Sequence, residues 1–393
     1  MSPISILSLE SSPFHGGVAS YVHQTAVGLA ELGARVIILT RRYPGLAREE
    51  ADIDRDLEVR WNVKVVRKDV RQHANLPHWL RIIKAHLAAH PGETVLIADN
   101  AGQRIASFVP FKNLRARYAV TVHGSEVFNT FDRRYARGFI NRALFPLLKA
   151  RAVRFYDRAD GVIFVSRYTQ ELFFGYFPRR LQRFRVIHNG IDRNLLIDPL
   201  ALKSKLARAR KELRLLTIAR VDRRKNHETV IRALAAMPDE VRDQVSYRIV
   251  GDGEYATVLK NLVGRLSLDR QVQFTGGVTD EEKLGLLDDS DVFVMPSKMH
   301  QGNVEGLGIS LLEAGARGLP LIGSHHGGIP EIVSPGQNGF LVDPDSPDDM
   351  RAALGSFLSD RSLCPLMGEN SRRIVEERFL REKAARETYD FLR

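Results

Sequence analysis

Short apolar runs alternate with longer stretches of helical periodicity along the first half of the chain. Residues 4–9 and 36–39 are apolar runs, and the helical pattern of residues 18–32 lies between them. Further runs of strand length occupy residues 94–98, 118–122, 161–165 and 184–187. Apolar runs separated by helices are typical of parallel strands that are buried on both faces. The pattern predicts an α/β fold in which a parallel sheet has helices on both sides.

The second half repeats this order after residues 192–210, which have no strand signal. Apolar runs at residues 213–218 and 247–250 enclose a polar loop and a helical pattern over residues 228–236. Later strands are expected at residues 272–274, 292–295, 320–323 and 339–342, and helices from Asp348 and from Ser371. The 393 residues also exceed the roughly 100 to 200 residues of a typical domain. We therefore expect two Rossmann-like domains in tandem.

The composition is that of an ordinary globular protein, with 44% hydrophobic and 27% charged residues. No apolar run reaches the roughly 18 to 20 residues of a membrane span, and Met1-Ser2-Pro3 does not begin a signal peptide. Cys364 is the only cysteine, so no intramolecular disulfide can form. These features predict a cytoplasmic protein.

Positive charge is concentrated in the first half of the chain. The net charge is +11, and residues 1–190 contain 29 Lys and Arg against 16 Asp and Glu, whereas residues 191–393 contain 29 against 31. Such an asymmetry attracts anionic partners, whether nucleic acid, lipid or a charged small molecule. The segment from Arg133 to Arg158 combines eight basic residues with apolar ones, which suits a helix on an anionic membrane as well as a solvated face. Pro146 interrupts this segment and argues against one continuous helix.

The most informative motif lies between Glu305 and Glu313. Two glycines precede an apolar helical start, so free backbone N–H groups and the positive end of the helix dipole favour a phosphate there. An isolated glutamate pair is more often solvated, but Glu313 lies inside an apolar run, where a buried charge needs a partner. The candidate ligand-binding residues are Glu305, Gly306, Leu307, Gly308, Ile309 and Glu313.

Charged and small residues follow other strands of the second half. Arg220 and Lys225 come after residues 213–218, at the strand end where parallel sheets bind ligands, and their charge suits a leaving diphosphate. A solvated basic loop explains the pair equally well. Gly251, in Gly251-Asp252-Gly253, and Ser297 also follow strands and are weaker candidates for close approach to a nucleotide.

The first half offers a glycine loop and a histidine. Gly16 and Gly17 follow the first strand and suit close approach to a phosphate, although a tight turn explains them more simply. The spacing is not that of a dinucleotide fingerprint, which counts against a dehydrogenase. His123 ends a strand at the expected mouth of a ligand site, and Glu126 follows as a residue that could face an acceptor.

Metal-binding patterns are weak. His325 and His326 are adjacent rather than one helical turn apart, and the Asp-x-Asp sequences lie in charged surface stretches or before a helix. We expect no catalytic metal ion and no cofactor.

Several further motifs occur in an order that resembles the retaining family 4 glycosyltransferases of GT-B fold. Glu305 and Glu313 match the family's motif of two glutamates separated by seven residues. The other matching stretches are His15-Gly16-Gly17, Thr121-Val122-His123-Gly124, Ile187-His188-Asn189-Gly190-Ile191-Asp192, Ala219-Arg220-Val221-Asp222 with Lys225, Gly251-Asp252-Gly253 and Gly327-Gly328-Ile329-Pro330-Glu331. Each stretch is weak evidence alone, but their order is that of the family, and the resemblance covers nearly the whole chain.

The resemblance implies two Rossmann-like domains whose parallel sheets face each other across a cleft. Residues 1–190 would form an acceptor-binding domain, residues 191–211 a linker, and residues 212–378 a nucleotide-sugar-binding domain. Residues 379–393 would form a helix that packs back on the first domain.

The resemblance also implies the reaction, a retaining and metal-independent transfer of a hexose from a nucleotide-diphosphate sugar to a sugar or glycolipid, as in bacterial surface polysaccharide or glycolipid synthesis. Arg220 and Lys225 would bind the diphosphate, Glu305 the hexose and Glu313 the ribose, with His123 beside the transferred sugar. The nucleotide sugar would be a co-substrate, and the enzyme would lie in the cytoplasm or at the inner face of the membrane.

Two alternatives stay open at this point. A sugar-nucleotide epimerase or a glycoside phosphorylase would use the same scaffold. A basic nucleic-acid-binding protein would use the first half, but the chain has no recognisable binding module and we expect no nucleic-acid partner.

Overall fold

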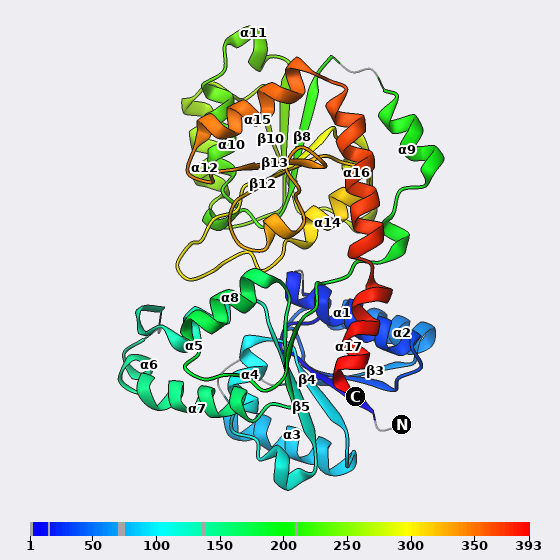
Figure 1. Cartoon of the computed structure of the whole chain (residues 1–393), viewed down its shortest axis with the longest axis vertical. Helices are drawn as coiled ribbons and strands as arrows, with labels where there is room; N and C mark the ends of the chain where they lie inside the picture. Colours follow the sequence, from blue (N-terminus) through cyan, green and yellow to red (C-terminus); the bar gives the residue numbers. More distant parts are fainter. Residues whose placement is uncertain (1–2, 15, 70–74, 136–137, 209–210) are drawn as a thin grey trace. The chain divides into compact units, whose positions relative to one another are not determined.

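The computed structural model describes residues 3–14, 16–69, 75–135, 138–208 and 211–393. The chain forms two compact units, one of Met1–Gly190 with Leu380–Arg393 and one of Ile191–Phe379. Each unit has its own parallel sheet with helices on both faces (Figure 1). This is the doubled α/β arrangement that the sequence predicted.

The first unit is built on a seven-stranded parallel sheet with the order β3-β2-β1-β4-β5-β6-β7. Its strands are β1 (Ile4–Leu7), β2 (Val36–Arg41), β3 (Val63–Lys68), β4 (Thr94–Ile97), β5 (Arg117–Val122), β6 (Gly161–Phe164) and β7 (Phe184–Val186). The sequence analysis did not find β3, because this edge strand interrupts its valines with Lys64, Arg67 and Lys68. Only Val63 of β3 is buried, so no apolar run marks the strand.

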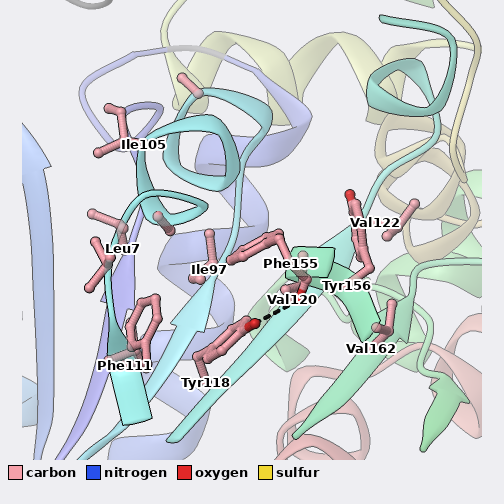
Figure 2. Packing of buried hydrophobic residues seen from close by; sticks show 14 of the residues in the cluster. Leu7, Ile97, Ile105, Phe111, Tyr118, Val120, Val122, Phe155, Tyr156 and Val162 are labelled. Atoms are coloured by element: carbon pink, nitrogen blue, oxygen red, sulfur yellow. Dashed lines mark hydrogen bonds between the residues drawn. The ribbon is translucent and has the colours of Figure 1, made fainter. Parts of the chain in front are cut away.

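One face of this sheet carries an aromatic core. The helices that cover it are α3 (Leu76–Ala89), α4 (Asn100–Ala106), α5 (Ser125–Phe131), α7 (Phe145–Asp157) and α8 (Arg167–Tyr176). Figure 2 shows Tyr118 of β5 close to Phe155 of α7, and the Tyr118 hydroxyl donates a hydrogen bond to the carbonyl oxygen of Phe155 at 2.6 Å. A buried hydroxyl with a partner costs little, so this core tolerates tyrosine among its aliphatic residues.

The opposite face carries α1 (Gly17–Glu31), α2 (Ala47–Trp61) and the last helix of the chain, α17 (Arg381–Leu392). In Figure 1 α17 lies beside α1. A methyl group on Gly28 of α1 would overlap Ala385, so the glycine allows the two helices to approach closely. Arg381 fixes the contact through Glu31, whose Oε1 lies 2.8 Å from Nη2. The C-terminal helix is therefore part of the first unit.

The second unit has a six-stranded parallel sheet with the order β10-β9-β8-β11-β12-β13. Its strands are β8 (Leu213–Ile218), β9 (Val245–Val250), β10 (Val272–Gly276), β11 (Val292–Met295), β12 (Leu321–Ser324) and β13 (Gly339–Val342). The helices α10 (His227–Ala235), α12 (Ala256–Arg265) and α15 (Pro347–Ser359) cover one face. The helices α13 (Asp280–Asp289), α14 (Ile309–Ala316) and α16 (Leu363–Arg378) cover the other.

Residues 191–211, which we expected to be a linker, lie in the second unit. They contain a helix, α9 (Pro199–Leu206), whose Lys205 is buried. The Lys205 ammonium group donates to the carbonyl oxygens of Leu287 and Arg317 at 2.9 and 2.8 Å. These bonds attach α9 to the body of the unit, which explains why the segment has helical rather than linker character.

The basic segment from Arg133 to Arg158 is divided. Over the residues that the structure describes it contains a 3-10 turn (Arg133–Tyr135), α6 (Phe139–Ala143) and α7, with Pro146 in the first turn of α7. Proline suits that position, since its missing N–H would have no helical partner there. Leu144 and Leu147 are 46% and 63% exposed. None of the described helices is both long and apolar enough to cross a bilayer.

Candidate functional site

Lys225, Arg224 and Glu305 form an ion cluster in the second unit. Lys225 Nζ lies 2.6 Å from Glu305 Oε2, and the Arg224 guanidinium donates to the same oxygen. The three side chains are 9%, 11% and 12% exposed. Ser297, fully buried at the end of β11, adds a longer contact from its hydroxyl to Glu305 Oε2 at 3.4 Å. Two predicted residues, Lys225 and Glu305, are therefore in direct contact. Ser297, which was also predicted, contacts the Glu305 carboxylate.

The local sequence explains why the two cations point to the same place. Asp222 caps a 3-10 turn over Arg223–Lys225 by accepting a hydrogen bond from the Lys225 N–H at 3.0 Å. Asn226 then turns the chain in the left-handed region, at φ 59°, and α10 begins. The Asn226 side chain donates to the carbonyl oxygens of Pro296 and Pro344 at 3.1 and 2.6 Å. This short turn fixes the basic loop against the ends of two strands.

The cluster keeps Glu305 ionised although this side chain is nearly buried. Burial acts to raise the pKa of Glu305, but Lys225 and Arg224 outweigh it and lower the pKa to about 2. Burial lowers the pKa of Lys225, and the neighbouring Glu305 opposes that shift. Glu305 is thus an anion over the whole physiological range, in contact with both basic side chains.

The loop before α14 is shaped by glycines on both sides. Gly308 has φ 104° and precedes α14, which starts at Ile309, while Leu307 is buried in the core. The turn Gly327-Gly328 packs on this loop, and the Gly328 N–H donates to the Glu305 carbonyl oxygen at 3.0 Å. A methyl group on Gly328 would overlap the carbonyl oxygen of Gly306. The glycines therefore determine where Glu305 and the start of α14 lie.

Glu313, the second glutamate of the motif, pairs with Lys283 of α13. Its Oε1 lies 3.2 Å from Lys283 Nζ, and the two side chains are 18% and 19% exposed. The sequence analysis expected a partner for this charge but did not find Lys283, because the two residues lie on separate helices. It also did not single out Arg224, since nothing in a run of basic residues says which one points inward.

Arg220 differs from its neighbours because its side chain is 68% exposed and its closest acid is Asp222, at 3.8 Å. The loop that carries Arg220 is set by Gly251 and Gly253. A methyl group on either glycine would overlap a carbonyl oxygen of that loop, at Ala219 or Val221, and Gly251 has φ 123°. Close packing of backbone on backbone thus requires glycine at both positions, and the approach of Gly251 to a nucleotide stays a prediction.

In the first unit His123 follows β5 and is held as a neutral ring. Its Nε2 is 2.9 Å from the Ala98 carbonyl oxygen, and its ring meets the edge of Tyr21 with centroids 5.0 Å apart. Burial lowers the pKa of His123 to about 4. Because a carbonyl can only accept, Nε2 must carry the hydrogen, and Nδ1 is left as an acceptor.

Two buried carboxyl groups flank His123. Glu126 accepts a hydrogen bond from the His123 backbone N–H, and Asp99 accepts from the N–H groups of Leu9 and Gly102 at 2.9 and 2.8 Å. Burial raises the pKa of each to about 7. Glu126 is 3% exposed, so it supports the histidine loop from inside and does not face an acceptor, which corrects our expectation.

The glycine loop of the first unit is only partly described. His15 lies outside the described residues, whereas Gly16 precedes α1 and Gly17 begins it, both of them exposed. Gly16 has an extended backbone with φ 177°, and a methyl group there would meet only the Phe14 side chain, at 3.2 Å. No steric demand of the described residues requires glycine at position 16.

The comparisons with known proteins divide the chain within about ten residues of the boundary between the two units. Residues 15–195 match the model of "Glycosyltransferase Family 4", and residues 200–374 match that of "Glycosyl transferases group 1". The chain belongs to glycosyltransferase family 4. The match favours transfer over the epimerase, phosphorylase and nucleic-acid-binding alternatives. This enzyme is a nucleotide-sugar-dependent hexosyltransferase of GT-B fold.

Individual relatives cover the whole length of this glycosyltransferase. A GDP-mannose-dependent alpha-(1-6)-phosphatidylinositol monomannoside mannosyltransferase of Mycobacterium tuberculosis is 29% identical over 100% of this chain and 98% of that protein. Among solved structures, Anabaena HepE with UDP and glucose has a TM-score of 0.78 at 19% identity, covering 100% of this chain and 99% of HepE. Sucrose-phosphate synthase of Thermosynechococcus elongatus has a TM-score of 0.76 at 22% identity, covering 99% and 98%.

Proposed function

We propose that this glycosyltransferase moves a hexose from a nucleotide-diphosphate sugar to a glycolipid or saccharide acceptor in surface polysaccharide or glycolipid synthesis, with retention of configuration and without a metal ion. The relatives that match over its full length are named for GDP-mannose and a phosphatidylinositol mannoside. GDP-mannose is therefore the first donor to test, with a phosphoinositol glycolipid as the first acceptor.

The observation that carries this proposal is the ion cluster at Glu305. Arg220, Arg224 and Lys225 face Asp222 and Glu305, so the group has a net charge of +1 before any ligand binds. A donor diphosphate would attract Lys225 and Arg224 and leave the Glu305 carboxylate free to accept hydrogen bonds from sugar hydroxyls. The same cations would stabilise the charge that grows on the phosphate as it leaves, which is the task that a metal ion has in other transferases.

Retention of configuration through a covalent intermediate would need a free carboxylate as nucleophile. The carboxylate of this site, Glu305, is already paired with Lys225 and Arg224, so we propose retention without such an intermediate. Glu305 has two cations on one oxygen and is a poor nucleophile in this arrangement. The acceptor oxygen would bond to the anomeric carbon as the bond from that carbon to the phosphate oxygen breaks. The acceptor proton would pass to the departing phosphate oxygen. His123 would contribute as a neutral acceptor through Nδ1, for a hydroxyl of the sugar.

A panel of nucleotide sugars tests the donor and the site together. We expect nucleotide release from one donor in the presence of acceptor, and loss of release in Glu305→Gln, which keeps the side-chain shape and removes the charge. Glu376→Gln is the matched control, since Glu376 is also ion-paired, to Arg372 at 2.8 Å, but lies on the exposed surface of α16. Equal activity of the two variants would contradict the site, and no release with any donor and glycolipid acceptor would contradict the reaction.

We also propose that the basic segment from Arg133 to Arg158 meets an anionic membrane through Leu144 and Leu147, the exposed leucines at the start of α7. Leu147→Glu should reduce sedimentation with vesicles of anionic phospholipid several-fold. Leu366→Glu is the control, because Leu366 is 56% exposed on α16 of the other unit. Equal sedimentation of the two variants would count against this contact.

A further inference from the structure

Two histidines and a glutamate meet at the amino edge of the first unit's sheet, among residues to which the transfer reaction assigns no role. His86 lies in the last turn of α3, His90 follows that helix, and Glu93 directly precedes β4. One nitrogen of each ring and one carboxylate oxygen all lie within 4.8 Å of one another. Over the described part of the chain this is the one group of three such side chains at that spacing. The sequence analysis weighed only the histidines at 325 and 326.

The ring nitrogens are oriented by their neighbours. His90 Nδ1 is 3.0 Å from the carbonyl oxygen of His86, to which it must donate, so the lone pair of His90 lies on Nε2. His86 turns its Nε2 toward Ser5 of β1 and toward Glu93, at 2.8 and 3.3 Å. A backbone carbonyl that fixes the tautomer of a histidine is a common outer-shell feature of metal sites.

The carboxylate of Glu93 is buried and only half satisfied. Glu93 is 0% exposed, and its Oε2 accepts a hydrogen bond from the Ser5 hydroxyl. Its other oxygen, Oε1, is buried and has no hydrogen-bond partner among the described residues. An unpaired oxygen of a buried carboxylate is costly, and a bound cation removes that cost. This observation is independent of the spacing of the three side chains and points to the same ligand.

We propose that His86, His90 and Glu93 bind a divalent transition-metal ion, with zinc as the ion that fits best. Two imidazoles and one carboxylate are a frequent zinc ligand set, and water or the Ser5 hydroxyl would complete a tetrahedron. Zinc ligands lie about 2.0 to 2.1 Å from the metal, hence roughly 3.4 Å from one another. Closing the present spread of up to 4.8 Å requires side-chain movements of only about 1 Å.

The position predicts a structural role for this ion. Ser5 lies in β1 and Glu93 directly precedes β4, and these two strands are neighbours, since Ile4 of β1 is paired with Thr94 of β4. The ion would therefore join the end of α3 to two central strands. Substrates of parallel α/β sheets bind at the opposite, carboxyl edge, so the ion acts on stability and not on transfer. The inference is thus independent of the proposed function and is compatible with metal-independent catalysis.

Zinc titration of the full-length protein without a histidine tag, after treatment with a chelator, tests the site. His90→Ala removes one ligand at a half-buried position after the helix, and His78→Ala, exposed on the same helix, is the matched control. We expect the wild type and His78→Ala to bind one zinc per chain, with a higher melting temperature in its presence. His90→Ala should bind at least about tenfold more weakly, and zinc should no longer raise its melting temperature.

Two results would overturn the proposal. One is the absence of stoichiometric zinc binding by the wild type at micromolar concentrations, and the other is equal zinc affinity in His90→Ala and His78→Ala. Glu93→Gln gives a second measurement, and circular dichroism reports whether this buried variant folds. If it does not fold, His90→Ala alone decides. Nucleotide release by the chelator-treated protein is assayed separately, so failure of the donor assay leaves the zinc result unchanged.

Discussion

The two units share an architecture, but their buried titratable side chains differ in charge. In the second unit Glu305 stays ionised, because it lies against Lys225 and Arg224 and its pKa falls to about 2. In the first unit His123 and Glu126 have few charged neighbours, and burial moves their pKa values to about 4 and about 7. Burial acts on all of them, and the presence or absence of a counterion decides whether the charge survives.

This difference suits the two units to different parts of the substrates. The second unit offers a preorganised ionic site, which suits a leaving diphosphate, whereas the first offers neutral hydrogen-bonding groups, which suit sugar hydroxyls. A charge that is already paired in the free protein can change partner without being created at the moment of reaction. The comparison therefore predicts that changes of charge do more damage in the second unit than in the first.

The largest effect is expected from removing the anion of the ionic site. Glu305→Gln should lower kcat by about 10³-fold, because it removes a charge that contacts the sugar and leaves Lys225 and Arg224 unbalanced. His123→Asn, which keeps a neutral acceptor in the first unit, should lower kcat by only about tenfold. Steady-state kinetics with the donor identified by the panel measures both. Equal losses would mean that the two units do not differ in the way proposed.

The second prediction concerns pH and the buried carboxyl of the first unit. In the folded state Glu126 keeps its proton up to about pH 7, whereas in the unfolded chain it loses the proton near its ordinary pKa of 4.5. Its contribution to stability is therefore full below pH 4.5 and is lost as pH rises toward 7. Glu305 has the opposite sign, since its contribution is full above pH 4.5 and is lost as pH falls toward 2.

Glu126→Gln mimics the protonated carboxyl and removes this dependence. Relative to the wild type, the variant should gain up to about 3 kcal/mol of unfolding free energy between pH 5 and pH 8. Urea unfolding at the two pH values measures the difference, and the titration of His123 cancels because both proteins contain it. If the difference in unfolding free energy between variant and wild type were the same at both pH values, Glu126 would ionise in the folded state as it does in the unfolded chain.

The third prediction uses glycines of the two candidate loops. Gly328→Ala would press a methyl group into the carbonyl oxygen of Gly306, and backbone cannot move aside as a side chain can. We expect a loss of about 2 kcal/mol in stability and a lower kcat, since the Glu305 loop must shift. Gly16→Ala in the first unit meets only the Phe14 ring and should leave stability within about 0.5 kcal/mol. Thermal unfolding that ranks the two variants in the reverse order would contradict this account.

The sequence was sufficient for the parts of the fold that repeat with a clear period. The strands at residues 94–97 and 292–295 are buried along their whole length and almost entirely apolar, and the sequence analysis found them. Strand β3 was missed because it lies at an edge, only Val63 of it is buried, and three of its six residues are basic. Periodicity reports burial on both faces, so an edge strand that is half exposed gives a weak signal.

The candidate site was predictable only as far as residue type and order allow. Lys225 and Glu305 were found because they follow strands and match family motifs, and the structure brings them within 2.6 Å. Arg224 and Lys283 were missed, because contacts between residues 81 and 30 positions apart are not visible in a single chain. The packing of Gly251 on the Ala219 carbonyl oxygen was missed for the same reason, since only the fold reveals which backbone the glycine meets, and its approach to a nucleotide stays a prediction.

The smallest effect is expected from Arg220, the exposed arginine beside the ion cluster. Its replacement distinguishes electrostatic attraction of the nucleotide from a contribution to the stability of the fold. Arg220 is 68% exposed and 3.8 Å from Asp222, so an exposed pair of this kind contributes little to stability. Arg220→Ala should therefore unfold within about 0.5 kcal/mol of the wild type while binding a nucleoside diphosphate about tenfold more weakly, with a smaller dependence on salt. Calorimetric titration at two salt concentrations measures this, with Arg104→Ala, an exposed arginine on α4 of the first unit, as the control. If Arg220→Ala and Arg104→Ala bind the nucleotide equally well, the positive charge that matters lies wholly in the buried pair at Glu305, and the ionic site is smaller than proposed.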